Sequence, residues 1–399
     1  MREAVVIDAV RTPVGKYGGV LKDVRSDDMA ALCIAEITKR NNLDPNKVED
    51  VIFGCSNQAG DDNRNVARMA LLLAGYPVEV GGQTINRLCG SALNAINSAA
   101  QAIKVGEGDV FVAGGTESMT RSPFVFGKAD SAFSRDATVY DSTIGWRFVN
   151  PKMKEKYGTL GMGETAEKVA EKYGITRKEQ DEFALLTQQK WGAAFTSGKF
   201  KDELVYVPTK GAKKGEVILV DRDEHPRPDV TIEQLAKLPA AFKKDGTVTA
   251  GNASGVNDGA AAVLLMEAET AKALGYKPIV RVVASAVAGV HPDYMGMGPV
   301  PATRKALQRA GLKIDDIDLV ELNEAFAAQS IPCIRELGLD PAKVNVNGGA
   351  IAIGHPLGST GARIFTTLVH EMKRRGSRYG LVSMCIGVGQ GIATIVERV

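Results

Sequence analysis

The order of predicted elements in the last third of the chain repeats the order in its first third. A helix, an acidic turn and a short strand follow one another over residues 27–54, and the same series returns over residues 302–322. A glycine-flanked helix and a strand span residues 89–115, and a matching pair spans residues 358–391. Repetition of this kind predicts two similar α/β halves.

Strands alternate with helices in both halves, which predicts βαβ units and a largely parallel sheet. The composition changes between the halves. Residues 119–247 are richer in charge, lysine and proline and carry isolated helical segments. We interpret this stretch as an insertion that lies over the core. The predicted division is therefore an N-terminal half from residues 1–118 and 248–271, an insertion at 119–247 and a C-terminal half at 272–399.

Composition excludes several classes of function. With 49 Lys and Arg against 47 Asp and Glu, the formal charge of +2 gives no surface for nucleic acid. No apolar run reaches the length of about 18 residues that predicts a membrane span. Five cysteines without paired spacing predict a reducing compartment and no metal cluster. A strand pattern begins at residue 3, which leaves no room for a signal peptide, so we expect a cytoplasmic protein.

Cys89 lies where a helix is predicted to begin. Leu93, Ile96, Ala100 and Ile103 recur at helical spacing and predict one buried stripe. Unpaired backbone N–H groups and the positive end of the helix dipole favour the thiolate, which is the nucleophilic form of cysteine. A free cysteine is equally often one more small buried residue, so this segment alone leaves both interpretations open.

His355 is the one histidine of four that stands among closely spaced glycines, at the mouth of a predicted helix. Glycines allow backbone conformations closed to other residues and a close approach of a ligand. Neutral imidazole is a suitable general base near pH 7. The alternative is a structural histidine in a glycine-rich turn.

Two further positions carry chemistry at strand ends. Cys385 precedes a glycine loop whose N–H groups suit a developing oxyanion, although on its own a buried thiol is the stronger interpretation. Asn323 follows a predicted strand, and its side-chain amide is suited either to donate a hydrogen bond in a site or to cap the helix that starts at Glu324.

These positions belong to four short motifs that occur in a fixed order. The motifs are Asn-Arg-Leu-Cys-Gly-Ser at 86–91, Asn-Glu-Ala-Phe at 323–326, Gly-His-Pro-Leu-Gly-Ser-Thr-Gly-Ala-Arg at 354–363 and Cys-Ile-Gly-Val-Gly-Gln-Gly at 385–391. With them the chain resembles the thiolase family, from residue 5 to the C-terminus. The resemblance implies a thiolase-like α/β fold, in which two similar βαβ halves stack as αβαβα layers and an inserted loop domain covers coenzyme A.

The resemblance also implies roles for the residues of these motifs. Cys89 would take the acyl group as a thioester, with His355 as the base that removes its proton. Cys385 would act as the acid and base at Cα or at the sulfur of CoA. Asn323 would hold a water molecule that forms one oxyanion hole with His355, and the N–H groups of Cys89 and Gly387 would form the other.

The implied reaction is the reversible cleavage of 3-oxoacyl-CoA by CoA to acetyl-CoA and acyl-CoA, or the Claisen condensation of acetyl-CoA. CoA and acyl-CoA are then substrates, and no tightly bound cofactor or metal is expected. By the same resemblance Arg227 lies near the adenosine phosphates, Ser254 near the pantetheine and Met162 near the acyl end. The family implies a homodimer or homotetramer.

Departures from the family pattern bear on the acyl chain. Acetoacetyl-type thiolases often have a histidine directly before the methionine, and this chain has Gly161 there. The stretches 57–68 and 143–152 look more like degradative 3-oxoacyl-CoA thiolases, especially the 3-oxoadipyl type. Arg147 in the second stretch is a candidate partner for an acyl chain that ends in a carboxylate.

Three alternative functions stay open at this point. The first is a biosynthetic acetoacetyl-CoA thiolase. The second is a decarboxylating condensing enzyme, although such enzymes generally use two histidines, or His and Asn, where this chain offers His355 and Cys385. The third is a catalytically silent CoA-binding relative, against which the intact Cys89 argues.

Overall fold

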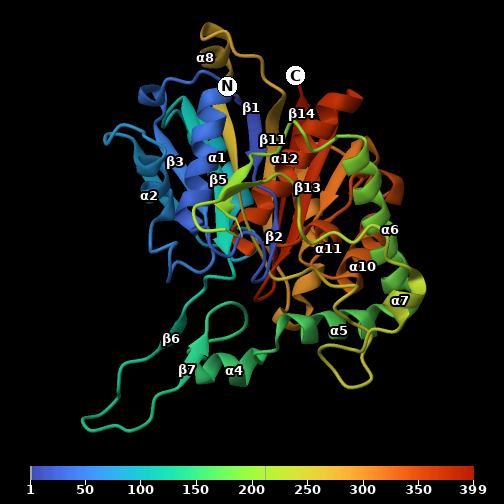
Figure 1. The fold of residues 1–399 in the computed structure, drawn as a ribbon. Coiled ribbons are helices and arrows are strands. Elements are labelled where there is room, and N and C mark those ends of the chain that lie inside the picture. Colours follow the sequence, from blue (N-terminus) through green and yellow to red (C-terminus); the bar gives the residue numbers. More distant parts are fainter. Residues whose placement is uncertain (1, 212) are drawn as a thin grey trace.

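The computed structural model describes residues 2–211 and 213–399. Its core is one sheet of ten strands in the order β12, β13, β14, β11, β1, β10, β5, β3 and β4, with the short β2 paired to β10 (Figure 1). The strands are β1 Ala4–Arg11, β2 Gly15–Lys16, β3 Asp50–Gly54, β4 Gly81–Ile85, β5 Val110–Ser118, β10 Asn257–Glu267, β11 Val280–Gly289, β12 Leu319–Leu322, β13 Tyr379–Ile386 and β14 Gln390–Arg398. The two halves of the sheet meet where β1 and β11 pair at only two positions.

Helices cover both outer faces of the sheet and fill the space between its halves. The helices are α1 Ser26–Arg40, α2 Val66–Leu73, α3 Ser91–Val105, α4 Pro151–Tyr157, α5 Met162–Tyr173, α6 Arg177–Thr196, α7 Ile232–Ala236, α8 Ala268–Ala273, α9 Pro299–Ala310, α10 Ala327–Leu337, α11 Ala350–Ile353 and α12 Leu357–Arg375. In the middle layer α3 and α12 share one core cluster with β5 and β10 on one side and β13 and β14 on the other. The outer layers are α1 and α2 on the N-terminal half and α9 and α10 on the C-terminal half. The αβαβα expectation is confirmed.

The predicted stripe of α3 is buried as expected. Leu93, Ile96, Ala100 and Ile103 are each at most 2% exposed and lie in the middle core. Full burial of a Leu or Ile side chain contributes about 1.5–3 kcal/mol, so this stripe fixes α3 firmly between the two sheet halves.

The expectation of a largely parallel sheet is wrong. Only β3 with β4, β3 with β5 and β12 with β13 are parallel pairs, whereas the remaining pairs of the sheet are antiparallel. The reason lies in the connections, since β13 and β14 are joined by a tight glycine turn with no helix between them. Strands β10 and β1 likewise pair antiparallel across the centre of the N-terminal half. Alternation of elements along the chain did not reveal these pairings.

Residues 119–247 form the part of the chain that lies outside the large sheet. Their strands pair only with each other, as β6 Phe124–Phe126 with β7 Val139–Asp141 and as β8 Val207–Lys210 with β9 Val217–Val220. Figure 1 shows the β6–β7 hairpin and α4 standing away from the layers, while α5, α6 and α7 flank the C-terminal half. The boundaries at 118/119, 247/248 and 271/272 stay a prediction. Within the residues that the structure describes, no helix combines the length and apolarity needed to cross a bilayer.

Candidate active site

A cavity of about 310 Å³ opens where the N-terminal half, the C-terminal half and the 119–247 stretch meet. Cys89, Gly387 and Met162 all line it, so the structure brings these three predicted residues together. Cys89 follows β4, Ser56 and Asn57 follow β3, Gly387 and Val388 follow β13, and much of the remaining wall comes from the 119–247 stretch. These strands belong to parallel pairs, and ligands of α/β proteins bind at the carboxyl ends of such strands.

A tight elbow presents Cys89 to the cavity. Leu88 has a left-handed φ of +48°, and Gly90 is the N-cap of α3, so Cys89 lies one residue before the N-cap. The hydroxyl of Ser91 donates to the carbonyl of Leu88 (2.6 Å) and accepts from the N–H of Arg87 (2.9 Å), which ties the elbow closed. A Cβ on Gly90 would lie 2.6 Å from Ile386, so glycine lets the elbow pack against the end of β13.

The Cys89 sulfur rests as a thiol. The pKa of Cys89 is raised to about 11, chiefly by burial and in smaller part by the charge of Glu117, although hydrogen bonds from the N–H groups of Gly387 and of Cys89 itself lower it. The expectation that the helix start favours a thiolate is therefore corrected: the N–H groups do point at the sulfur, but the cost of burying a charge outweighs them. A base has to remove this proton.

His355 is held as a neutral base. It is 5% exposed, and burial together with the charge of Arg363 lowers the pKa of His355 to about 3. The Thr360 hydroxyl donates to the carbonyl of Pro356 (2.8 Å) and lies 2.7 Å from Nδ1 of His355. Because that hydroxyl already donates its one hydrogen to Pro356, it must accept a hydrogen bond from Nδ1–H of His355. The lone pair of the imidazole is therefore on Nε2. The backbone N–H of His355 donates to Asn257 (2.9 Å), which fixes the loop.

Asn323 faces the reactive side of that imidazole. It directly follows β12, its backbone N–H donates to the carbonyl of Ser383 (3.0 Å), and it is fully buried. Its Nδ2 lies 3.5 Å from Nε2 of His355. Its Oδ1 is buried with no hydrogen-bond partner among the described protein atoms. A buried amide oxygen of this kind suits a bound water or substrate group.

Cys385 lies near the end of β13 and is 1% exposed. Burial raises the pKa of Cys385 well above its ordinary value, and the charge of Cys89 is the next cause. The two sulfurs are thus electrostatically coupled, so that ionisation of one opposes ionisation of the other. Both sulfurs therefore rest as thiols near neutral pH.

The three predicted CoA contacts lie in three different places. Met162, the first residue of α5, lines the main cavity with its sulfur 3.6 Å from where a Cβ of Gly387 would lie. Arg227 lines a second cavity of about 410 Å³ that shares Thr143 and Ile144 with the first. Ser254 lines neither cavity, and its backbone N–H donates to the carbonyl of Ala325 beside Asn323 (2.9 Å).

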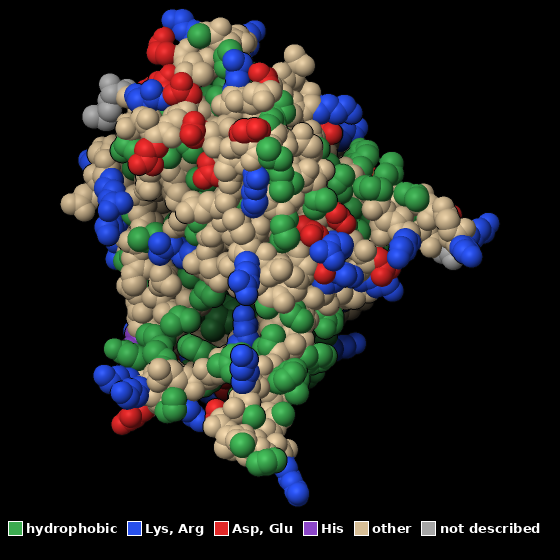
Figure 2. Space-filling view, turned by 90° about the vertical axis from the view of Figure 1, so that its left-hand side faces the viewer, with side chains coloured by type: hydrophobic (Ala, Val, Ile, Leu, Met, Phe, Trp, Pro, Cys, Tyr) green, Lys and Arg blue, Asp and Glu red, His purple; other side chains and the backbone are tan. Residues whose placement is uncertain are grey.

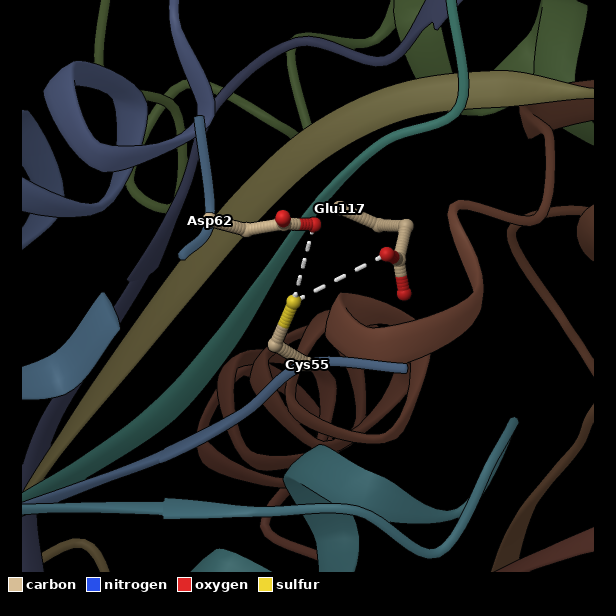
Figure 3. A group of neighbouring side chains, drawn as sticks. All are labelled: Cys55, Asp62 and Glu117. Carbon is tan, nitrogen blue, oxygen red and sulfur yellow. Dashed lines mark hydrogen bonds between the residues drawn. The ribbon is translucent and has the colours of Figure 1, made fainter. Parts of the chain in front are cut away.

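Several residues of the site escaped the sequence prediction. Thr360 and Asn257, which orient His355, stand five residues after it and about a hundred before it, and nothing in their local pattern marks a role. The third is Glu117, which is buried beside Cys55 and Asp62 (Figure 3). Their carboxylate and thiol ligand atoms lie within 4.8 Å of one another, the spacing of a possible metal site.

Hydrogen bonds already occupy the Glu117 cluster. The Glu117 carboxylate accepts from the N–H and hydroxyl of Ser56 (2.9 and 2.5 Å) and from the N–H of Gly358 (2.7 Å). The Cys55 thiol lies 3.3 Å from Asp62 and 3.7 Å from Glu117, and burial together with these carboxylates raises the pKa of Cys55 well above its usual range. Cys55 therefore donates as a thiol. The cluster joins the loop after β3 to the first turn of α12, just behind His355.

Comparison with known proteins identifies the family of this arrangement. Residues 4–269 match the family model described as thiolase, N-terminal domain, and residues 276–398 match the thiolase, C-terminal domain. The chain is 58% identical to the 3-oxoadipyl-CoA/3-oxo-5,6-dehydrosuberyl-CoA thiolase of Escherichia coli K12 and 52% identical to an acetyl-CoA acetyltransferase of Syntrophomonas wolfei, over 100% and 99% of both chains. The crystal structure of human mitochondrial 3-ketoacyl-CoA thiolase in complex with CoA superposes with a TM-score of 0.92 at 44% identity, covering 100% of this chain and 98% of that one.

Proposed function

The chain belongs to the thiolase family, and from this premise we propose how its own residues carry out the reaction and which acyl chain it prefers. The protein is an acyltransferase that acts on CoA thioesters, by thiolytic cleavage of 3-oxoacyl-CoA or by Claisen condensation of acetyl-CoA. The observation that carries the mechanism is a neutral histidine, His355, whose Nε2 carries the lone pair and faces Asn323, in a site whose nucleophile candidate, Cys89, rests as a thiol.

In the proposed first step, Nε2 of His355 removes the Sγ proton of Cys89, and the sulfur attacks the C3 carbonyl of 3-oxoacyl-CoA. The N–H groups of Cys89 and Gly387, which already point at the sulfur, donate to the oxyanion that forms on this carbonyl. A covalent acyl carrier splits one difficult transfer into two easier ones.

In the proposed second step, the C2–C3 bond breaks and its electron pair passes to C2 of the leaving acetyl-CoA, which takes the Cys385 proton. Asn323, through a water molecule, and His355 stabilise the enolate oxygen of acetyl-CoA before that proton arrives. Cys385 is then a thiolate and removes the proton of an incoming CoA thiol. The CoA sulfur attacks the acyl-Cys89 carbonyl, and Cys89 leaves as a thiol with the proton that His355 returns.

We propose the 3-oxoadipyl type as the preferred substrate class, with a biosynthetic acetoacetyl-CoA thiolase as the alternative. The E. coli relative at 58% identity carries the 3-oxoadipyl name, and the S. wolfei relative at 52% supports the alternative. Gly161, which N-caps α5 at the cavity wall, favours the first because acetoacetyl-type thiolases often place a histidine there. A decarboxylating condensing enzyme and a silent relative fit less well, since Cys385 offers a thiol where the former use an imidazole or amide.

We further propose that the chain assembles as a homodimer or homotetramer. The β6–β7 hairpin protrudes from the layers (Figure 1) and carries Phe124, Phe126 and Phe133, which are 74%, 69% and 99% exposed. Large exposed aromatic side chains gathered on one segment mark an interaction surface more often than a solvated loop.

The test of the proposed function is a thiolysis assay with the purified chain. Acetoacetyl-CoA, 3-oxohexanoyl-CoA and 3-oxoadipyl-CoA are each mixed with CoA, and consumption of the 3-oxoacyl-CoA is followed. We expect turnover of all three, with the highest kcat/KM for 3-oxoadipyl-CoA. Folded protein that turns over none of them contradicts the mechanism, whereas a preference for acetoacetyl-CoA contradicts only the substrate class.

A further inference from the structure

The main cavity contains one cationic side chain and one acidic one. Of all the residues that line it, only Glu117 and Arg147 are charged. Glu117 is fully buried, and its oxygens are occupied by the donors of Ser56 and Gly358. An acyl chain that enters the cavity therefore meets Arg147 as its only available charged partner.

Arg147 is half-buried and unpaired within the chain. Among the residues that the structure describes, no carboxylate lies within ion-pair distance of the Arg147 guanidinium. By contrast, Arg25 and Arg121 both pair with Asp61. A half-buried guanidinium with no internal partner keeps its planar fork of donors for a ligand.

The backbone around Arg147 is fixed on both sides. The indole N–H of Trp146 donates to the carbonyl of Leu160 (3.1 Å), which ties the segment to the cavity wall. The ring of Phe148 packs on Tyr140 with centroids 5.0 Å apart. Left-handed φ values of +90° at Gly145 and +50° at Phe148 set the turns on either side. Arg147 thus extends from an anchored segment.

The rest of the cavity wall includes polar side chains that suit a carboxylate. Side-chain amides and hydroxyls line the same cavity, from Asn57, Asn86, Ser122, Ser142 and Thr143. On one face of the molecule, Figure 2 shows a hollow of hydrophobic side chains beside a column of Lys and Arg. A neutral alkyl end gains nothing from a guanidinium, whereas a carboxylate gains charge-assisted and bidentate hydrogen bonds.

We propose that Arg147 binds the distal carboxylate of a 3-oxodicarboxylyl-CoA and is the residue that selects this class over neutral 3-oxoacyl chains. The inference rests on the proposed thiolase function and deepens it. Cleavage of the C2–C3 bond of such a substrate leaves an acyl-Cys89 whose far end is a carboxylate. Arg147 holds that end before the bond breaks and in the acyl-enzyme.

The test compares two six-carbon substrates that differ in their distal end, 3-oxoadipyl-CoA and the neutral 3-oxohexanoyl-CoA. We measure kcat/KM for both with the full-length wild type, Arg147→Met, Arg147→Lys and the control Arg222→Met. Arg222 is exposed, belongs to the same 119–247 stretch and lines neither cavity. Removal of a charge-assisted bidentate contact is expected to lower kcat/KM about 10–100-fold.

In Arg147→Met we expect this loss for 3-oxoadipyl-CoA and a much smaller one for 3-oxohexanoyl-CoA, so that the wild-type preference disappears. Arg147→Lys keeps the charge but not the fork and should fall between. Arg222→Met should retain the preference. Activity of Arg147→Met on the neutral substrate reports that this variant is folded.

Four results overturn the inference. Equal losses on both substrates would mean that Arg147 binds a part common to both, such as the CoA phosphates. Retention of the preference in Arg147→Met would mean that another group binds the distal carboxylate. A wild type that turns over both substrates without preference refutes the selection itself and the proposed substrate class, but not the thiolase mechanism. A wild type inactive on both refutes the proposed function.

Discussion

At Cys89 two influences of opposite sign act on one sulfur. Backbone N–H groups favour the thiolate, and burial with the charge of Glu117 favours the thiol, so that the pKa of Cys89 is raised to about 11. Burial wins because a charge loses the solvation of bulk water, while two N–H donors replace only part of it. The consequence is a nucleophile that stays protonated until His355 acts. This arrangement makes the histidine, and not the helix dipole, the agent of activation.

The pH dependence of acylation follows from His355. With a pKa of about 3, His355 is neutral between about pH 5 and pH 8, so we expect the single-turnover acylation rate to stay flat across that range. Stopped-flow mixing with acetoacetyl-CoA at a series of pH values measures it. A rate that falls about tenfold per pH unit below 6.5 would mean that the histidine keeps its ordinary pKa.

The same shift has a stability consequence with a definite sign. Below pH 6.5 an unfolded chain protonates this histidine while the folded chain does not, so the free energy of unfolding falls as pH falls from 6.5 towards 3, by up to about 1.4 kcal/mol per pH unit from this group. Above pH 6.5 His355 contributes no slope.

Thr360 sets the tautomer of His355 and so controls its ability to act as a base. Thr360→Val removes the hydroxyl that accepts from Nδ1–H, and the ring is then free to place its proton on Nε2. We expect acylation to slow about 10–100-fold with little change in KM, whereas Thr360→Ser restores most of the rate. Equal loss in both variants would point to packing as the cause.

The roles of Thr360 and Glu117 show where residue-level prediction from sequence ends. Cys89, His355, Cys385 and Asn323 stand at predicted ends of strands and helices, and a pattern in the chain marked each of them. Glu117 meets Gly358 across 241 positions, and Thr360 acts through a helical turn whose orientation depends on the whole middle layer. Such contacts exist only after folding.

At the scale of elements, close approach in the middle layer depends on glycines. A Cβ on Gly361 of α12 would lie 2.4 Å from the backbone N of Leu93 in α3, and a Cβ on Gly115 of β5 would lie 2.2 Å from the carbonyl oxygen of Gly358. Backbone atoms cannot move aside as a flexible side chain does. The two helices that follow the nucleophile and the base along the chain thus approach closely because glycine has no side chain at these contacts.

Gly361→Ala tests this packing. Alanine favours a helix by about 1 kcal/mol over glycine, but overpacking of a close contact costs about 1–3 kcal/mol and here meets backbone. We expect a net loss of stability in urea unfolding and a lower kcat, because α3 and α12 shift apart. The control is Gly127→Ala, where the nearest atom to the new Cβ is 3.6 Å away. Unchanged stability and kcat in Gly361→Ala would contradict the account.

Elements with local signals were predictable from sequence, and pairings between distant strands were not. The helix predicted at the start of residues 27–54 is observed as α1, Ser26–Arg40, and the stripe of α3 is buried as its spacing predicts. Strand direction depends on partners far along the chain, such as β1 with β10, which explains why the sheet is mixed and not largely parallel.

At the scale of the whole molecule, the exposed β6–β7 hairpin predicts self-association. Replacing Phe126 and Phe133, 69% and 99% exposed, with serine should lower the assembled mass in light scattering, because serine removes apolar area that an interface would bury. Tyr206→Ser, 52% exposed away from the hairpin, serves as the control and should leave the mass unchanged. An unchanged mass in the double variant would assign the contact to another surface.

The active site is shared between the two halves of the chain. One half supplies the nucleophile, and the other supplies its base and the second thiol. The measurement that tests this most directly is peptide mapping by mass spectrometry after a brief reaction with acetyl-CoA. We predict acetyl on Cys89 in the wild type and in Cys385→Ser, and none in Cys89→Ser. Acetyl found on Cys385 instead would reverse the roles of the two cysteines.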